Sequence, residues 1–124
     1  MDMDKTVLII DDDEQILELL KMFIENNQCL AETAASAEKG LALARKKEYA
    51  LILLDIMLPD GDGLTVLRNI KKSVSSIPVI MITGGNDITV AEQCLEEGAV
   101  DYITKPFDFE YLRTTIIANM LASS

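Results

Sequence analysis

The chain has 124 residues, 49% of them hydrophobic and 26% charged, which is the size and composition of one folded domain rather than of a disordered chain. Its 11 basic and 21 acidic residues give a formal net charge of −10, which argues against direct binding to nucleic acid or to an anionic membrane, because both are bound through basic patches. No apolar run approaches the roughly 18–20 residues of a membrane span, and the acidic start over residues 1–5 is unlike a secretory signal, so we expect a cytoplasmic protein with one domain over residues 1–124.

Short apolar runs alternate with helical patterns in the first half of the chain. Residues 7–10 (VLII) form a continuous apolar run, which is typical of a strand buried on both faces of a sheet. A helix is predicted over residues 13–27, because acidic residues open it and apolar residues then recur at helical spacing. A weaker strand follows over residues 29–34, Ser36 can cap a second helix, and residues 51–54 predict a third strand.

The second half continues the same alternation. It predicts, in order, a loop over residues 59–63, a helix over 64–70, a strand over 79–82, a helix over 88–97, a strand over 102–104 and a helix over 108–120. Gly98 is a C-terminal cap signal, and Asp108 is an N-terminal cap signal. Five strands separated by helical crossovers predict an α/β fold with three layers, in which a five-stranded parallel sheet has helices on both faces.

Polar side chains follow four of the five predicted strands. Asp11, Asp12 and Asp13 follow the first strand, Asp55 the third, Thr83 the fourth and Lys105 the fifth. Ligands of open α/β sheets bind beyond the carboxyl ends of the strands, at the topological switch point. We therefore expect these side chains to converge at one edge of the sheet, except for Asp13, which with Glu14 favours the start of the first helix.

Three of these carboxylates predict a metal site. If Asp11, Asp12 and Asp55 lie within ~5 Å of one another, each ionised pair repels by about 3 kcal/mol at an effective dielectric constant near 20, which raises their pKa values or attracts a cation. Oxygen ligands suit a hard ion, so we expect Mg²⁺, with Mn²⁺ as a possible substitute. The chain has no histidine, which excludes histidine metal sites and Ser-His-Asp catalysis. Its two cysteines, Cys29 and Cys94, indicate ordinary buried or half-buried thiols.

Asp55 also suits a nucleophilic role. An aspartate carboxylate can accept a phosphoryl group, and this attack needs positive charge around the phosphoryl oxygens. Mg²⁺ and the Lys105 ammonium would supply that charge, and the Thr83 hydroxyl could donate a hydrogen bond to a phosphoryl oxygen.

These residues resemble the receiver domain of two-component response regulators, and the resemblance covers nearly the whole chain. It is carried by residues 7–13 (VLIIDDD), 53–63 (LLDIMLPDGDG), 78–84 (PVIMITG) and 98–107 (GAVDYITKPF). It implies a flavodoxin-like sheet with strand order 2-1-3-4-5. It also implies that Asp55 is the phosphoacceptor, and that the metal ligands are Asp12 and Asp55 directly, Asp11 mostly through water, and the backbone carbonyl of Met57.

The resemblance further implies a switch. Thr83 and Lys105 would bind the phosphoryl oxygens, Tyr102 would be the aromatic residue whose position reports phosphorylation, and the peptide bond before Pro106 would be cis. Movement of Thr83 towards the phosphoryl group would open a space for Tyr102 and shift the surface around the fourth helix, the fifth strand and the last helix, which controls an effector domain or protein.

A partner must supply the phosphoryl group, because the chain has no histidine of its own. The resemblance implies a histidine kinase or a histidine phosphotransfer protein. The domain would catalyse its own phosphotransfer and dephosphorylation without being a conventional turnover enzyme. The oligomeric state stays open, because the last helix lacks the charged pattern of receivers that dimerise through that surface.

Two other classes of protein remain as alternatives. A Mg²⁺-dependent phosphatase with an aspartyl nucleophile would place a second aspartate two residues after Asp55, where this chain has Met57. A flavin-binding electron carrier on the same fold needs a phosphate-cradling loop after the first strand, and the carboxylates of residues 11–13 would repel that phosphate.

Overall fold

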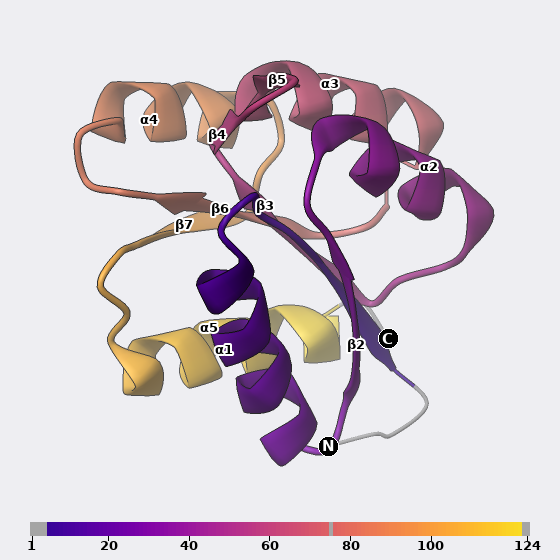
Figure 1. Cartoon of the computed structure of the whole chain (residues 1–124), viewed down its shortest axis with the longest axis vertical. Helices are drawn as coiled ribbons and strands as arrows, with labels where there is room; N and C mark the ends of the chain where they lie inside the picture. The colour runs from indigo at the N-terminus through magenta and orange to yellow at the C-terminus, as the bar shows by residue number, and fades with distance from the viewer. Residues whose placement is uncertain (1–4, 75, 123–124) are drawn as a thin grey trace.

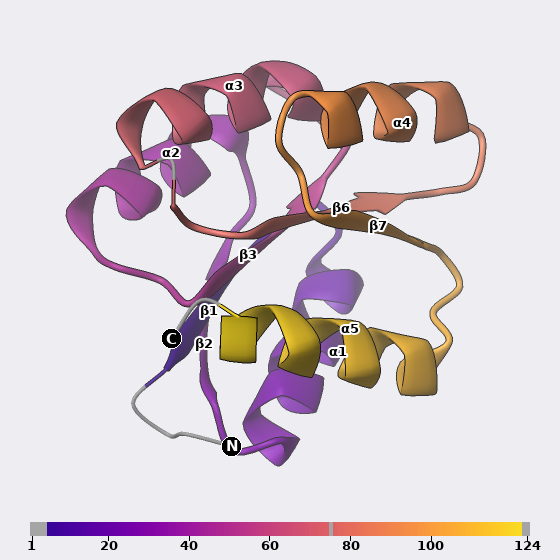
Figure 2. The same ribbon diagram turned by 180° about the vertical axis from the view of Figure 1, so that it is seen from behind.

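The computed structural model describes residues 5–74 and 76–122, which form a sheet flanked by helices (Figures 1 and 2). The strands of this part of the chain are β1 (Thr6–Ile10), β2 (Leu30–Ala34), β3 (Leu51–Asp55), β4 (Met57–Leu58), β5 (Gly61–Asp62), β6 (Val79–Thr83) and β7 (Asp101–Thr104). Its helices are α1 (Glu14–Asn26), α2 (Ala37–Lys46), α3 (Gly63–Ser73), α4 (Ile88–Glu96) and α5 (Phe109–Ala122). Each helix and each long strand therefore lies where the sequence predicts it.

Five of the strands form one parallel sheet in the order β2-β1-β3-β6-β7. This is the predicted order 2-1-3-4-5 once the two short strands β4 and β5 are set aside, so the predicted fold class is confirmed. Helices α1 and α5 cover one face of the sheet, and α2, α3 and α4 cover the other (Figures 1 and 2). The three layers leave the carboxyl ends of the strands together at one edge.

The sheet separates two apolar cores, because successive side chains of a strand point to opposite faces. In β1, Val7 and Ile9 belong to the core beneath α1 and α5, whereas Leu8 and Ile10 belong to the core beneath the other three helices. Every residue of β3 and β6 is buried, as expected for central strands of a parallel sheet. Gly40 lets α2 approach β1 closely, since a Cβ atom there would lie 2.6 Å from Cδ1 of Ile10.

Local capping signals set the helix boundaries. The carboxylates of Asp13 and Asp108 accept hydrogen bonds from backbone N–H groups in the first turns of α1 and α5, and the Ser36 hydroxyl does so for α2. Gly98, directly after the last turn of α4, has φ of 114°, a left-handed conformation that glycine adopts without strain. These four predictions are confirmed.

The segment predicted as a loop over residues 59–63 overlaps a small antiparallel hairpin, which spans residues 57–62. Met57 of β4 pairs with Asp62 of β5, and Leu58 pairs with Gly61. Strands of two residues are too short for an alternating apolar pattern, so no periodicity in the sequence predicts them. Asp62 then caps α3 by accepting a hydrogen bond from the backbone N–H of Thr65 at 2.8 Å.

Both cysteines and the helix lengths agree with the sequence analysis. Cys29 and Cys94 are both buried, one in each core, as predicted. Within residues 5–74 and 76–122, no helix combines the length and the hydropathy that crossing a bilayer requires.

Candidate functional site

Parallel strand pairing brings the predicted polar residues to one edge of the sheet. Ile10 of β1 lies opposite Leu54 of β3, so the residues that follow them in the chain, Asp11 and Asp55, are neighbours. On its other side, Asp55 lies opposite Ile82 of β6. The carboxylate of Asp55 therefore stands near the middle of the edge, between the ends of β1 and β6.

Three carboxylates converge there. Asp11, Asp12 and Asp55 can each offer an oxygen such that all three oxygens lie within 4.8 Å of one another. Asp11 is fully buried and Asp55 is nearly so, whereas Asp12 is exposed. The backbone N–H of Asp13 donates a hydrogen bond to Oδ1 of Asp11 at 2.9 Å, which fixes the orientation of that carboxylate. The site thus has a rigid buried side and an open side.

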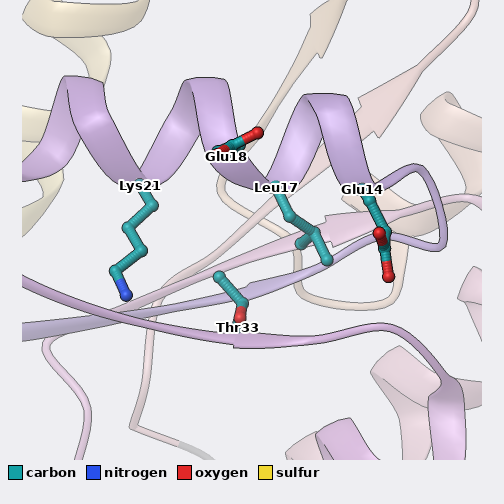
Figure 3. Close-up of a pocket in the computed structure, with 5 residues that line it drawn as sticks. All are labelled: Glu14, Leu17, Glu18, Lys21 and Thr33. Atoms are coloured by element: carbon teal, nitrogen blue, oxygen red, sulfur yellow. The ribbon is translucent and has the colours of Figure 1, made fainter.

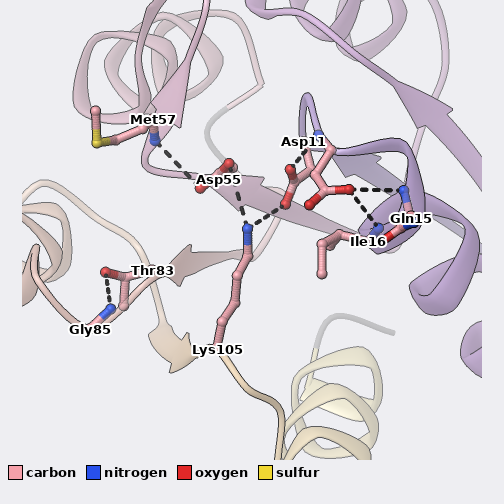
Figure 4. A network of polar contacts seen from close by, with 9 residues as sticks. Asp11, Gln15, Ile16, Asp55, Met57, Thr83, Gly85 and Lys105 are labelled. Carbon is pink, nitrogen blue, oxygen red and sulfur yellow. Dashed lines mark hydrogen bonds and ion pairs between the residues drawn. The ribbon is translucent and has the colours of Figure 1, made fainter.

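Lys105 supplies the positive charge of the site. Its Nζ lies 3.1 Å from Oδ2 of Asp11 and 3.9 Å from Oδ2 of Asp55 (Figure 4). Oδ2 of Asp11 is buried and accepts no hydrogen bond from the described residues. The ion pair with Lys105 therefore offsets the charge of this buried oxygen. One ammonium faces three carboxylates, which leaves an excess of negative charge.

The excess charge perturbs the titration of Asp55. Burial of the side chain and the nearby charge of Asp11 raise the pKa of Asp55 to about 7, although Lys105 and the backbone N–H of Met57 oppose this shift. The N–H of Met57 donates to Oδ1 of Asp55 at 3.4 Å. A carboxyl group held this far above its ordinary pKa is typical of functional sites.

A divalent cation fits this arrangement. The site offers converging carboxylate oxygens, a buried oxygen of Asp11 without a hydrogen-bond donor, and net negative charge. Hard divalent ions prefer oxygen ligands of this kind, whereas softer metals are usually bound by sulfur or imidazole. The acidic cluster can therefore hold a metal ion.

Thr83 lies at the same edge, but its hydroxyl makes no hydrogen bond to Asp55. It accepts a hydrogen bond from the backbone N–H of Gly85 at 3.3 Å, and the residue is fully buried (Figure 4). A Cβ atom built on Gly84 or Gly85 would meet nothing within 4 Å, and Gly85 has φ of 93°. The turn after β6 therefore has open space around it.

The other residues that the resemblance implies for the switch, Tyr102 and Pro106, lie in β7 and shortly after it. Tyr102 of β7 is partly buried and packs against the core beneath α2, α3 and α4. It lines an open groove of about 390 Å³ between the start of α4, β7 and α5, together with Ile88 and Tyr111. The peptide bond between Lys105 and Pro106 is cis.

A second groove lies between α1 and β2. It has a volume of about 300 Å³ and is lined by Leu17, Thr33 and three charged residues, Glu14, Glu18 and Lys21 (Figure 3). None of the three predicted metal-binding carboxylates lines it. The acidic cluster beside Lys105 is therefore the better candidate for chemistry.

The sequence analysis missed two residues that shape the site. A Cβ atom on Gly63 would lie 2.7 Å from the backbone carbonyl oxygen of Asp55 and from Cα of Ile56, so only glycine lets α3 begin this close to the acidic edge. Asp60 binds the start of α2 through both carboxylate oxygens. The turn-forming residues 59–63 mark this loop, but its distant contact with α2 has no local signal.

Comparison with known proteins agrees with this geometry. The family model of the response regulator receiver domain matches residues 7–117. The probable C4-dicarboxylate response regulator DctR of Halalkalibacterium halodurans is 35% identical over 112 residues, which cover 89% of this chain and 49% of that protein. The transcriptional regulatory protein SrrA of Staphylococcus aureus is 38% identical over 105 residues, which cover 85% of this chain and 43% of that protein. The chain thus matches about half of the length of these curated relatives.

A solved structure shows the same likeness over the whole domain. The CheY-like response regulator receiver domain protein from Methanospirillum hungatei has a TM-score of 0.91 and 34% sequence identity, and the match covers 96% of this chain and 95% of that one. Its similarity therefore extends over nearly the whole chain and every layer of the fold. Sequence, strand order and site geometry lead to one assignment: the chain belongs to the response regulator receiver domain family of two-component signalling.

Proposed function

We propose that Asp55 accepts a phosphoryl group from a phosphorylated histidine of a kinase or phosphotransfer protein in a Mg²⁺-dependent reaction. The observation that carries this proposal is the position of the Asp55 carboxylate, between two other carboxylates and within 3.9 Å of the Lys105 ammonium. A nucleophilic oxygen, a place for a divalent cation and a fixed positive charge meet at one point. Phosphoryl transfer requires these three components.

The cation would be held by Asp11, Asp12, Asp55 and the backbone carbonyl of Met57. Mg²⁺ suits this set because it is commonly bound by one or two carboxylates together with water and a phosphate oxygen. When bound, Mg²⁺ supplies two positive charges that offset the carboxylates and the incoming phosphoryl oxygens. Mn²⁺ would be a substitute with the same ligands.

The transfer itself forms one bond and breaks one. A carboxylate oxygen of Asp55 attacks phosphorus, an O–P bond of an acyl phosphate forms, and the P–N bond to the donor histidine breaks. The electron pair of that bond returns to the imidazole ring. The ring leaves as neutral imidazole if its other nitrogen carries a proton, and otherwise it takes up a proton from water. Asp55 must be ionised to attack, and Lys105 favours its ionised form.

Lys105 and Thr83 then hold the product. The Lys105 ammonium, now paired mainly with Asp11, would bind a phosphoryl oxygen, and the Thr83 hydroxyl would donate a hydrogen bond to another. Thr83 must turn away from Gly85 to do so, which frees space for Tyr102 beside α4. The groove between α4, β7 and α5 would change shape and alter contact with an effector.

The domain would act as a switch and not as a turnover enzyme, because the product is the phosphorylated protein itself. Loss of the phosphoryl group to water would reset the switch. Neither alternative class of protein fits this chain as well: the receiver family model matches residues 7–117, and Met57 stands where an aspartyl phosphatase would place its second aspartate.

The test is incubation with a small acyl phosphate donor and Mg²⁺, with intact mass as the measurement. We expect the parent chain to gain the mass of one phosphoryl group, and Asp55→Asn to gain none. Asp13→Asn is the matched control: it changes another aspartate of the same edge, whose carboxylate caps α1, and asparagine is an equally good cap. This variant should be phosphorylated like the parent. Phosphorylation of Asp55→Asn to the parent level would contradict the proposal.

A further inference from the structure

Asp60 connects the acidic site to a helix that contributes no residue to it. Asp60 follows β4, and its Oδ1 and Oδ2 accept hydrogen bonds from the backbone N–H groups of Ala37 at 2.8 Å and Glu38 at 3.0 Å. Ser36 supplies the ordinary local cap of the same helix by accepting from the N–H of Lys39 at 3.2 Å. The first turn of α2 therefore has two caps, and one of them comes from the loop beside Asp55.

The hairpin that bears Asp60 is held at two points. At its base, the backbone N–H of Gly63 donates to the carbonyl of Ile56 at 2.6 Å. At its tip, a Cβ atom on Gly61 would lie 3.6 Å from Cβ of Ala37, so the tip is packed against the start of α2. In Figure 1 the hairpin lies above the sheet, beside the upper end of α2. An isolated hairpin with strands of two residues is not stable, so these contacts fix its position.

The hairpin that these contacts hold in position includes Met57. This residue is the first of β4, its N–H donates to Asp55, and its backbone carbonyl is the proposed fourth ligand of the cation. Its side chain is 65% exposed and therefore cannot anchor the segment by packing. Backbone contacts therefore place the Met57 carbonyl: the hydrogen bond to Asp55, the pairing with Asp62, and the contacts at the base and at the tip of the hairpin.

We propose that Asp60 is a positioning residue for the cation site: by tying the hairpin tip to α2, it holds the Met57 carbonyl beside Asp55. This inference rests on the proposed function, since it assumes that the cluster of Asp11, Asp12 and Asp55 binds Mg²⁺. Binding of the cation would also order the first turn of α2, because coupling between two sites is reciprocal. The two backbone hydrogen bonds also lower the pKa of Asp60, which keeps its carboxylate charged at neutral pH.

The main experiment compares the Mg²⁺ dissociation constants of four proteins by calorimetric titration at 0.15 M salt. The proteins are the parent chain, Asp60→Ala, Ser36→Ala and Asp62→Asn. Ser36→Ala removes a cap from the same end of α2 without releasing the hairpin. Asp62→Asn removes one negative charge from the same hairpin and keeps the cap of α3, because asparagine caps as well as aspartate.

We expect Asp60→Ala to bind Mg²⁺ about tenfold more weakly, at the lower end of what outer-shell groups contribute to metal affinity. Ser36→Ala should lower the melting temperature and leave Mg²⁺ affinity within about twofold of the parent value, since its effect is confined to α2. Asp62→Asn should show only the small effect of one screened charge. The proposal would be overturned if Asp60→Ala lost no Mg²⁺ affinity. It would also be overturned if Ser36→Ala or Asp62→Asn lost as much affinity as Asp60→Ala.

Amide hydrogen exchange separates this proposal from the proposed function. In the parent chain, Mg²⁺ should slow exchange at Ala37 and Glu38, and in Asp60→Ala it should not. Slower exchange at both amides in Asp60→Ala as well would overturn the role of Asp60 while leaving cation binding intact. Failure of the parent chain itself to bind Mg²⁺ would instead overturn the proposed function, and this inference with it.

Discussion

Gly63 shows how one missing side chain sets the geometry of the site. It is the first residue of α3, and its Cα lies so close to the strand end that an added Cβ would overlap the backbone of Asp55 and Ile56. Backbone atoms cannot swing aside as a flexible side chain can. A larger residue must therefore displace the segment that carries Asp55, the proposed phosphoacceptor.

We predict that Gly63→Ala lowers the free energy of unfolding by about 1–3 kcal/mol, the usual cost of overpacking. Gly84→Ala is the matched control, because a Cβ there meets nothing within 4 Å and Gly84 lies at the same edge of the sheet. Urea denaturation of both variants measures the difference. Equal stability of Gly63→Ala and Gly84→Ala would contradict the close contact seen at Gly63.

The three consecutive aspartates, Asp11, Asp12 and Asp13, also differ from one another in their surroundings and contacts. Asp11 is buried and paired with Lys105, Asp12 is exposed and faces the cluster, and Asp13 caps α1. The sequence predicts that Asp13 starts the helix whereas Asp11 and Asp12 stay with the strand end, because a strand end and a helix start impose different surroundings on neighbouring residues. The sequence does not predict that Asp11 is buried beside Lys105 while Asp12 is exposed. It does not predict that the Thr83 hydroxyl points to Gly85, since hydroxyl orientation depends on a turn that has no fixed sequence signal.

At the scale of elements, polar contacts join the edge strand β2 to the loop between α2 and β3. Glu32 of β2 accepts a hydrogen bond from the hydroxyl of buried Tyr49 at 2.8 Å and pairs with Lys47, both from the loop between α2 and β3. Lys47 and then Tyr49 lower the pKa of Glu32 through these hydrogen bonds. The ionised form of Glu32 thus stabilises the contact of β2 with this loop.

The sign of the pH dependence follows from that shift. A carboxyl group whose pKa is lower in the folded state contributes stability above its unfolded pKa, near 4.5, and loses it as the pH falls through the folded pKa. We predict that Glu32→Gln is less stable than the parent at pH 7, by less than about 1 kcal/mol because the pair is partly solvated. This difference in stability should close as the pH falls below 4.5 and through the lower pKa of the folded state.

Thermal denaturation at several pH values measures this gap. Glu48→Gln, which removes an exposed carboxylate from the same loop, is the control and should leave stability nearly unchanged. A stability difference for Glu32→Gln that stays constant between pH 7 and pH 3 would contradict the role given to its charge.

The elements also show where prediction from sequence ends. The buried strands β1, β3 and β6 have continuous apolar runs, and the helices have capping residues, so their positions could be predicted from local signals. The hairpin of β4 and β5 could not, because strands of two residues carry no periodicity. The contact of Asp60 with α2 joins residues more than 20 positions apart, and only the tertiary structure reveals it.

At the scale of the whole molecule, the parallel sheet gathers chemistry that is dispersed along the sequence. Asp11 and Lys105 are separated by most of the chain, yet strand order places their charged groups 3.1 Å apart. The fold thereby concentrates negative charge at one edge of a protein whose formal net charge is already −10. Such an edge attracts a divalent cation. A negatively charged phosphoryl group can approach it once a bound cation offsets the charge of the carboxylates.

The most direct test of the central claim is chemical mapping of the phosphorylated residue. Borohydride reduction of an aspartyl phosphate leaves a stable mark on the modified side chain, which mass spectrometry of peptides can locate after treatment with a phosphodonor and Mg²⁺. We predict that the mark lies on Asp55 and disappears when the cation is chelated. A mark on Asp11, Asp12 or any other residue, or the same yield on Asp55 without a divalent cation, would contradict the account.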